Sequence, residues 1–140
     1  MKIIKTIYIL FFVLIFASCK KTQNQSVPYV PVNITIYPSL PQYIKLTTIG
    51  GWAYVSGGSK GIIVYRKSND EFMAYDRHCP YKVEDGCVVA IDSTTNIIVK
   101  DKCCNSQFIL TDGSVSNGPA TTGLLKYATT YNGNALTINN

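Results

Sequence analysis

The chain has 140 residues, carries 13 Lys and Arg against 8 Asp and Glu, and contains five cysteines and one histidine. Its basic residues are scattered and form no basic helix or run longer than two residues, so we expect no nucleic-acid partner. The part of the chain that follows the apolar N-terminus is large enough for one domain with its own hydrophobic core.

The N-terminus has the features of an export signal. Two lysines precede an unbroken apolar run over residues 7–17, which is shorter than the ~20 residues that a membrane-spanning helix needs. The small residues Ala17 and Ser18 stand directly before Cys19, which resembles a bacterial lipobox. We therefore predict a signal peptide over residues 1–18, acylation of Cys19 and a lipid anchor in the bacterial cell envelope. The alternative is a soluble secreted protein in which Cys19 is a free thiol.

An extended tether is predicted next, over residues 19–41. Polar side chains dominate residues 20–26, and four prolines between residues 28 and 41 keep the chain extended. Within the tether, residues 32–36 alternate between apolar and polar side chains, which predicts a first edge strand.

From residue 51 onward, short β-branched and aromatic runs recur at roughly ten-residue spacing and are separated by Gly, Asn and Asp. The expected strands cover residues 52–55, 62–65, 72–75, 87–91, 97–99, 108–110, 124–127 and 135–138. Asp112-Gly113 is a clear tight turn, and Asn132-Gly133 between two alternating segments is the strongest hairpin signal. The pattern predicts an all-β antiparallel domain over residues 42–140.

Four cysteines fall in two segments where the strand pattern breaks. Cys79 and Cys87 lie in the first segment, and Cys103 and Cys104 lie in the second. Loops of this kind can hold a metal through four thiolates, as in zinc and iron–sulfur sites. The spacing lacks paired Cys-x₂-Cys motifs, however, and an oxidising envelope favours disulfides. We expect no catalytic residue, because there is no Cys-x-x-Cys motif and no histidine free to act as a base.

The residues around these loops resemble a Rieske-type 2Fe–2S domain. Residues 74–81 are similar to its first ligand loop, which has a Cys-x-His pattern, and residues 103–108 are similar to its second. The tail of the family is matched further on by Gly113, Gly118-Pro119-Ala120, Leu125 and Tyr127. The resemblance covers about residues 52–138 and implies a Rieske-like antiparallel β-sandwich whose tip is formed by the two loops.

The resemblance also implies an incomplete ligand set. A Rieske centre binds one iron through two cysteines and the other through two histidines. Cys79 and Tyr81 fall on the first Cys and His positions, and Asp101 and Cys104 fall on the second. Because one ligand of four is retained, we expect no metal or cofactor, with a 2Fe–2S cluster of unusual ligands as the alternative.

A shifted alignment would place Asp76 and His78 on the first Cys-x-His pattern. That alignment leaves Cys79 without a role and disturbs the strand that ends near Asp76. A single histidine at a loop edge is more often hydrogen-bonded or solvated than a ligand, and we expect this of His78.

The resemblance further implies a disulfide between Cys87 and Cys103, because many Rieske domains link their two loops at these positions. Without a cluster, the family positions of Cys79 and Cys104 would face each other. A disulfide needs Cα atoms ~5–6 Å apart, so a second bridge, Cys79–Cys104, is predicted. Pairing Cys79 with Cys103 and Cys87 with Cys104 remains an open alternative.

These observations predict an envelope-anchored lipoprotein whose Rieske-like domain is a structural or binding module pinned by disulfides, and not an enzyme. Its expected partners are the membrane, through the lipid anchor, and an envelope protein that the sequence does not identify. The alternative is a Rieske-type electron-transfer protein whose 2Fe–2S centre has unusual ligands.

Overall fold

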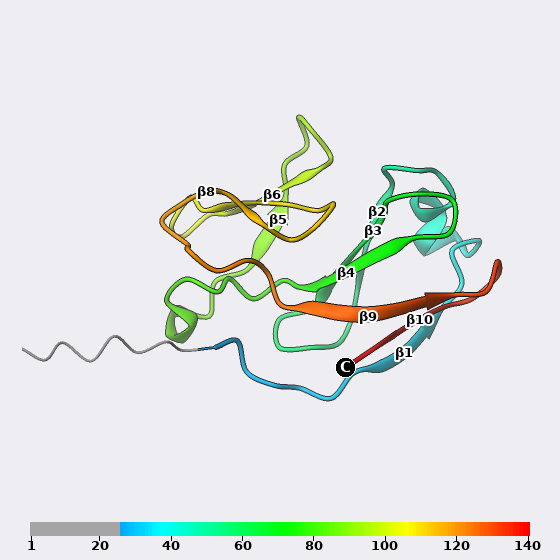
Figure 1. Cartoon of the computed structure of the whole chain (residues 1–140), viewed down its shortest axis with the longest axis horizontal. Coiled ribbons are helices and arrows are strands. Elements are labelled where there is room, and N and C mark those ends of the chain that lie inside the picture. Colours follow the sequence, from blue (N-terminus) through cyan, green and yellow to red (C-terminus); the bar gives the residue numbers. More distant parts are fainter. Residues whose placement is uncertain (1–25) are drawn as a thin grey trace, which may run out of the picture.

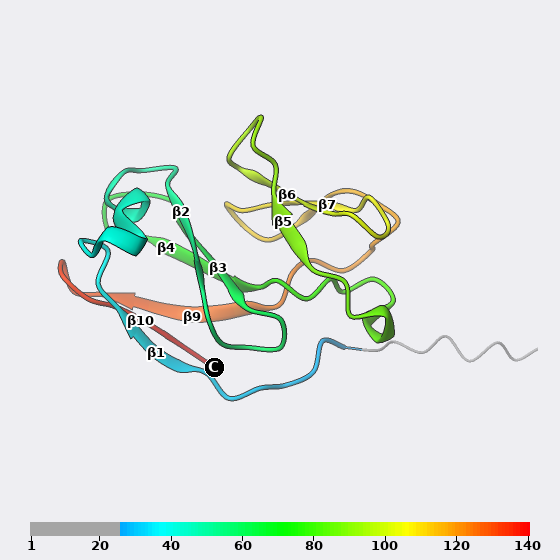
Figure 2. The same cartoon turned by 180° about the vertical axis from the view of Figure 1, so that it is seen from behind.

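The computed structural model describes residues 26–140, which form two antiparallel β-sheets (Figure 1; Figure 2). The all-β antiparallel prediction is therefore confirmed. The predicted signal peptide, Cys19 and the first part of the expected tether lie outside the described residues. Within residues 26–140, no helix is long and apolar enough to cross a membrane.

The larger sheet has six strands and curls into a half-barrel, with the strand order β1-β10-β9-β4-β3-β2. Its strands are β1 (Asn33–Ile36), β2 (Trp52–Val55), β3 (Ile62–Arg66), β4 (Phe72–Asp76), β9 (Lys126–Tyr131) and β10 (Leu136–Asn139). Strand β1 lies at the edge of the sheet and pairs with β10 alone, as expected for a first edge strand. The Asn132-Gly133 signal is also confirmed, because β9 and β10 form an antiparallel hairpin around it.

The smaller sheet has four strands that are adjacent in the order of the chain. They are β5 (Val89–Ile91), β6 (Ile98–Asp101), β7 (Gln107–Ile109) and β8 (Val115–Asn117). Strand β8 was not predicted, because two of its three side chains are polar and exposed, so it carries no apolar pattern. Two short 3₁₀ helices, η1 (Pro41–Thr47) and η2 (Val83–Asp85), complete the elements of the described residues.

The smaller sheet is formed by the part of the chain that lies between strands β4 and β9 of the larger sheet. Strands β4 and β9 are hydrogen-bonded neighbours, with Ala74 opposite Tyr127 and Tyr75 opposite Lys126. The chain therefore leaves the larger sheet after β4, builds the smaller sheet, and returns beside the strand it left. Figure 1 shows the smaller sheet projecting beside the larger one.

Both faces of the central strands β3 and β4 are buried. One face contributes Ile62, Val64, Phe72 and Ala74 to the core of the curled sheet, together with residues from β1, β9 and β10. The other face contributes Ile63, Tyr65, Met73 and Tyr75 to a second core shared with the smaller sheet. Strands that are covered on both sides carry continuous apolar runs instead of alternation, which explains the sequences Ile-Ile-Val-Tyr and Phe-Met-Ala-Tyr.

Candidate functional site

The two cysteine loops emerge at the same end of the smaller sheet, where Val89 of β5 lies opposite Asp101 of β6. The first loop, residues 77–88, joins β4 to β5 and is closed by a bridge between His78 and Val88 and by a 2.9 Å hydrogen bond from the Cys79 N–H to the Cys87 carbonyl. The second loop, residues 102–106, joins β6 to β7 and turns tightly. Because β5 and β6 are paired, the two loops emerge side by side.

A disulfide links the two loops through Cys87 and Cys103. This is the bridge that the family resemblance implied, and it is confirmed. The alternative pairing, which joined Cys79 to Cys103 and Cys87 to Cys104, is wrong, because Cys87 and Cys103 are bonded to each other.

The second predicted bridge differs from the structure. Among the described residues, Cys79 and Cys104 are free cysteines rather than partners in a disulfide. The Cys104 sulfur lies 3.2 Å from Oδ2 of Asp101, which accepts its hydrogen bond. The thiol of Cys104 is thus directed at a carboxylate and not bonded to the other sulfur.

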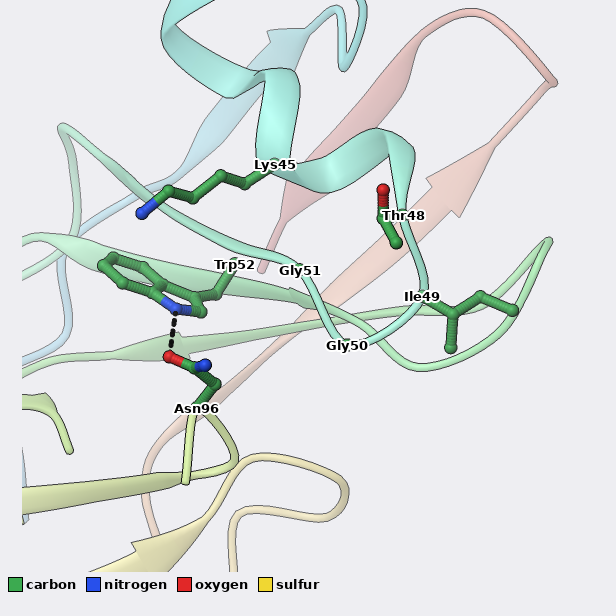
Figure 3. A pocket seen from close by; sticks show the side chains of 7 residues that line it. All are labelled: Lys45, Thr48, Ile49, Gly50, Gly51, Trp52 and Asn96. Carbon is green, nitrogen blue, oxygen red and sulfur yellow. Dashed lines mark hydrogen bonds between the residues drawn. The ribbon is translucent and has the colours of Figure 1, made fainter. Parts of the chain in front are cut away.

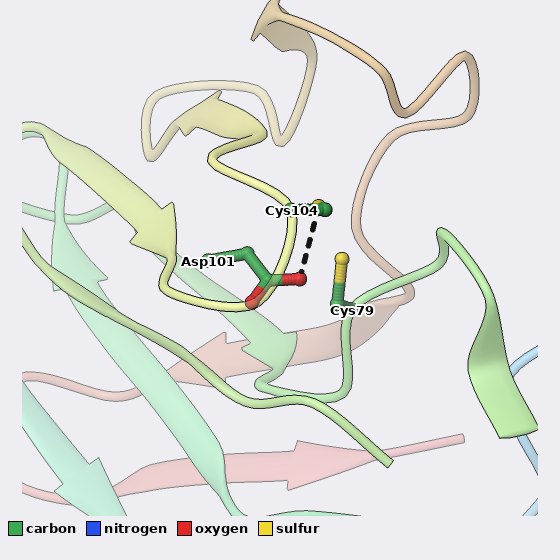
Figure 4. A group of neighbouring side chains, drawn as sticks. All are labelled: Cys79, Asp101 and Cys104. Carbon is green, nitrogen blue, oxygen red and sulfur yellow. Dashed lines mark hydrogen bonds between the residues drawn. The ribbon is translucent and has the colours of Figure 1, made fainter. Parts of the chain in front are cut away.

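Cys79, Asp101 and Cys104 form a compact group of side chains of the kinds that can bind a metal ion (Figure 4). Their two sulfur atoms and one carboxylate oxygen all lie within 4.8 Å of one another. Cys79 is 0% exposed and Asp101 is 1% exposed, whereas Cys104 is half-buried. The three side chains come from the first loop, from the last residue of β6 and from the second loop, so this group exists only where the loops meet.

Backbone and side-chain hydrogen bonds hold the group in place. The Cys103 N–H donates to Oδ1 of Asp101 at 2.7 Å, which orients the carboxylate. The Ser106 hydroxyl lies 3.0 Å from the Cys104 sulfur, and the Ser106 N–H points to the same sulfur at 3.4 Å. The Ala120 N–H donates to that hydroxyl at 2.9 Å, so the segment before β9 covers the site.

Burial raises the pKa of the Cys79 thiol well above its ordinary range, and its hydrogen bond to the Asp101 carboxylate raises the pKa further. A hydrogen bond from the Tyr81 N–H acts in the opposite direction. With no cation in the site, Cys79 is therefore a neutral thiol at physiological pH and donates toward the carboxylate. A buried charged carboxylate needs partners of this kind.

Tyr81, which falls on the first His position of the resemblance, is not part of the ligating group. Its side chain is partly buried and packs against the core of the smaller sheet, and the Lys82 ammonium lies 5.7 Å from the centre of its ring. The contribution of Tyr81 to the site is its backbone N–H, which faces the Cys79 sulfur.

His78 lies in a different polar cluster and is hydrogen-bonded, as expected. Its Nε2 atom is 2.9 Å from the Val83 carbonyl oxygen, and its Nδ1 atom is 2.8 Å from the Ser59 hydroxyl. A carbonyl only accepts, so Nε2 carries a proton and donates to Val83, while Nδ1 shares a hydrogen bond with the Ser59 hydroxyl. Both ring nitrogens are occupied, and His78 offers no lone pair to the site at Cys79.

Sequence reasoning did not single out Ser106 and Ala120 as supporting residues, although both stand within the stretches that carry the family resemblance. It also missed an open hollow of about 330 Å³ between the segment from η1 to the start of β2 and the turn between β5 and β6 (Figure 3). The hollow is lined by Lys45, Thr48, Ile49, Gly50, Gly51, Trp52 and Asn96. There the Lys45 ammonium lies 4.5 Å from the centre of the Trp52 ring. This lining contains no carboxylate, thiol or imidazole.

Comparison with known proteins adds no family to this description. No protein-family model matches the chain, and no curated protein matches it.

Proposed function

We propose that this protein is an envelope-anchored lipoprotein whose Rieske-like domain works as a structural or binding module, pinned at its tip by the Cys87–Cys103 disulfide. The lipid anchor follows from the sequence around Cys19. The domain is proposed to be Rieske-like because the two motif-bearing loops lie together on a small sheet that is inserted between two paired strands of a larger one. On this proposal the chain is not an enzyme, and its partners are the membrane and another envelope protein.

The shortage of histidine favours a structural or binding module over an electron carrier. A Rieske centre needs two imidazole nitrogens on its second iron, and the chain has one histidine. That histidine, His78, has both nitrogens in hydrogen bonds with Ser59 and Val83. The positions that correspond to the two histidines hold Tyr81 and Cys104, so the usual mixed-ligand centre has no nitrogen donor.

A second candidate is a Rieske-type electron-transfer protein with unusual ligands. The gathering of the ligating atoms of Cys79, Asp101 and Cys104 within 4.8 Å favours it, because cluster ligands must converge in this way. On this candidate function, thiolate and carboxylate ligands would replace the two histidines.

Iron content decides between the two. The full chain is expressed with its signal sequence, purified from membranes in detergent without exposure to air, and assayed for iron, acid-labile sulfide and visible absorption. The proposed module is colourless with negligible iron, also after incubation with ferrous iron and sulfide. About two irons and two sulfides per chain would overturn the proposal and support the electron carrier.

A further inference from the structure

The free thiols of Cys79 and Cys104 and the carboxylate of Asp101 form a donor set of a definite chemical type. Thiolates select soft and borderline cations, whereas Mg²⁺ and Ca²⁺ prefer oxygen alone. Two sulfurs with one carboxylate oxygen suit Zn²⁺, which binds sulfur at about 2.3 Å and carboxylate oxygen at about 2.0–2.2 Å. Tetrahedral bonds of these lengths place the donors roughly 3.4–3.8 Å apart, and the three atoms here already lie within 4.8 Å of one another.

The surroundings of the three donors are suited to a bound cation. Oδ1 of Asp101 is occupied by the Cys103 N–H at 2.7 Å, which leaves Oδ2 facing the sulfurs. The Ser106 N–H points to the Cys104 sulfur at 3.4 Å. Hydrogen bonds of this kind orient metal ligands and stabilise the thiolate form. The neighbouring disulfide at Cys103 holds the second loop against the first.

We infer that Cys79 Sγ, Cys104 Sγ and Asp101 Oδ2 bind one Zn²⁺ ion, with a water molecule as the fourth ligand. The water enters from the side of Cys104, which is half-buried, while Cys79 and Asp101 close the inner side. On binding, each thiol releases its proton to solvent and no electrons are transferred. The inference rests on the proposed function, because a two-iron cluster would need the same sulfurs.

The zinc ion would be a second cross-link between the two cysteine loops, beside the disulfide. Both join the loop after β4 to the loop after β6, the disulfide through Cys87 and Cys103 and the ion through Cys79 and Cys104. A ligand that binds the native state and not the unfolded chain stabilises the fold in proportion to the logarithm of its concentration. The domain is therefore expected to melt at a higher temperature in the presence of zinc.

The test uses the full chain in detergent with the Cys19→Ser substitution, so that Cys19 offers no competing thiol. The protein is handled under argon without reductant, and mass spectrometry verifies that the Cys87–Cys103 bridge is intact. Zinc is then measured by elemental analysis after dialysis and by competition with a chromophoric chelator. Co²⁺ serves as a spectroscopic probe, because thiolate ligation gives intense near-ultraviolet charge-transfer bands. We expect one zinc per chain, cobalt–thiolate bands and a raised melting temperature.

Two variants and a matched control locate the site. In Asp101→Asn the side-chain oxygen still accepts from the Cys103 N–H, so the fold is kept while the charged ligand is lost. Cys104→Ser removes a half-buried sulfur beside polar neighbours. Each should weaken zinc binding by about 100-fold or more, because even supporting partners of ligands are worth 10–100-fold. Asp92→Asn, at a half-buried aspartate in the turn between β5 and β6, should leave binding unchanged.

The outcomes separate this inference from the proposed function. The zinc site is overturned if the colourless protein binds no zinc. It is also overturned if Asp101→Asn and Cys104→Ser bind zinc as tightly as the native sequence does. In both cases the proposed structural or binding function is unaffected. A Cys79–Cys104 disulfide in protein isolated without zinc overturns the site in the same way. Two irons with two sulfides per chain overturn the proposed function itself. If Cys104→Ser fails to fold, the loss of zinc-dependent stabilisation in Asp101→Asn decides the question.

Discussion

The hydroxyl of Tyr127 donates a 2.7 Å hydrogen bond to the buried carboxylate of Asp76, and this bond ties β9 to the end of β4. The same carboxylate accepts backbone N–H groups of Ser59, Lys60 and His78. Asp76 is the last residue of β4 and therefore fixes the point at which the chain leaves the larger sheet, directly before the first cysteine loop. The geometry of the candidate site depends on this anchor although Asp76 is not part of the site.

Replacing Tyr127 with Phe should cost about 1.5–3 kcal/mol of unfolding free energy, the usual range for a hydrogen bond to a charged group. Burial, followed by the hydrogen bond to Asp76, raises the pKa of Tyr127, so its hydroxyl remains a donor at ordinary pH. Urea denaturation of the purified protein measures the change. The control is Tyr131→Phe, whose hydroxyl bonds the Gly133 carbonyl at an exposed site and should cost about 1 kcal/mol or less. Equal losses in both variants would contradict the role given to Asp76.

Gly58→Ala should be among the more destabilising small substitutions in the chain. Gly58 has φ of +62°, and a Cβ there would collide with Oδ2 of Asp76 and the hydroxyl of Tyr127. Gly133 has φ of +90°, and a Cβ added there would meet nothing within 4 Å. Gly133→Ala therefore measures only the loss of unfolding free energy that comes from placing a side chain at positive φ. We expect about 1–2 kcal/mol for Gly133→Ala and about 1–3 kcal/mol more for Gly58→Ala. Chemical denaturation measures the unfolding free energy of both variants. Equal losses would show that a Cβ at Gly58 does not clash with Asp76 and Tyr127.

Loss of the Cys87–Cys103 disulfide should destabilise the domain by about 3 kcal/mol, since the bridge closes a loop of 16 residues. Cys87→Ser, Cys103→Ser and the double variant should lose the same amount, because either single change already breaks the bond. Melting curves with and without reductant provide the measurement. Reductant should lower the melting temperature of the native sequence and leave that of Cys87→Ser unchanged; a shift in both would point to a second bond.

Thiol labelling should find two free cysteines in the described part of the chain, and they should differ in reactivity. In the Cys19→Ser background without metal, Cys104 is half-buried and should react in the native protein. Cys79 is 0% exposed, so it should react only after denaturation without reductant. Mass spectrometry then counts one label before unfolding and two after it. Complete absence of label after denaturation would restore the two-bridge expectation drawn from the sequence.

Acylation of Cys19 stays a prediction from the sequence. Cys19→Ala should leave the precursor unprocessed or unanchored, because the acyl chains are attached to this sulfur and acyl chains supply about 0.8 kcal/mol of membrane affinity per buried CH₂ group. Membrane fractionation and the mass of the N-terminal peptide check the result. Unchanged processing and unchanged membrane association would favour the soluble secreted alternative. Ser18→Ala, a change between small residues, is the control and should be processed normally.

Much of the strand pattern could be predicted because it is local. Residues 52–55 were expected as a strand and form β2 with the same limits, and residues 62–65 and 72–75 fall one residue short of β3 and β4. Strand β8 and the two 3₁₀ helices were not predicted, because none of them carries a periodic apolar pattern. Strand β8 has mostly exposed polar side chains and is defined by its pairing with β7. Helix η1 is a short 3₁₀ segment whose single buried side chain, Leu46, gives no helical period.

The sequence by itself determined the fold class, the turns and the presence of two cysteine-bearing loops, since each depends on residues close together in the chain. Only the tertiary structure decided what those cysteines do. The family resemblance set Asp101 on a cluster-ligand position without indicating its contacts, and the end of β6 places it 1% exposed beside two sulfurs. Its carboxylate accepts the hydrogen bond of the Cys104 thiol, and Cys79 and Cys104 are free cysteines instead of the predicted second bridge. Contacts between loops that are far apart in the chain depend on how the two sheets dock, and no local pattern encodes that.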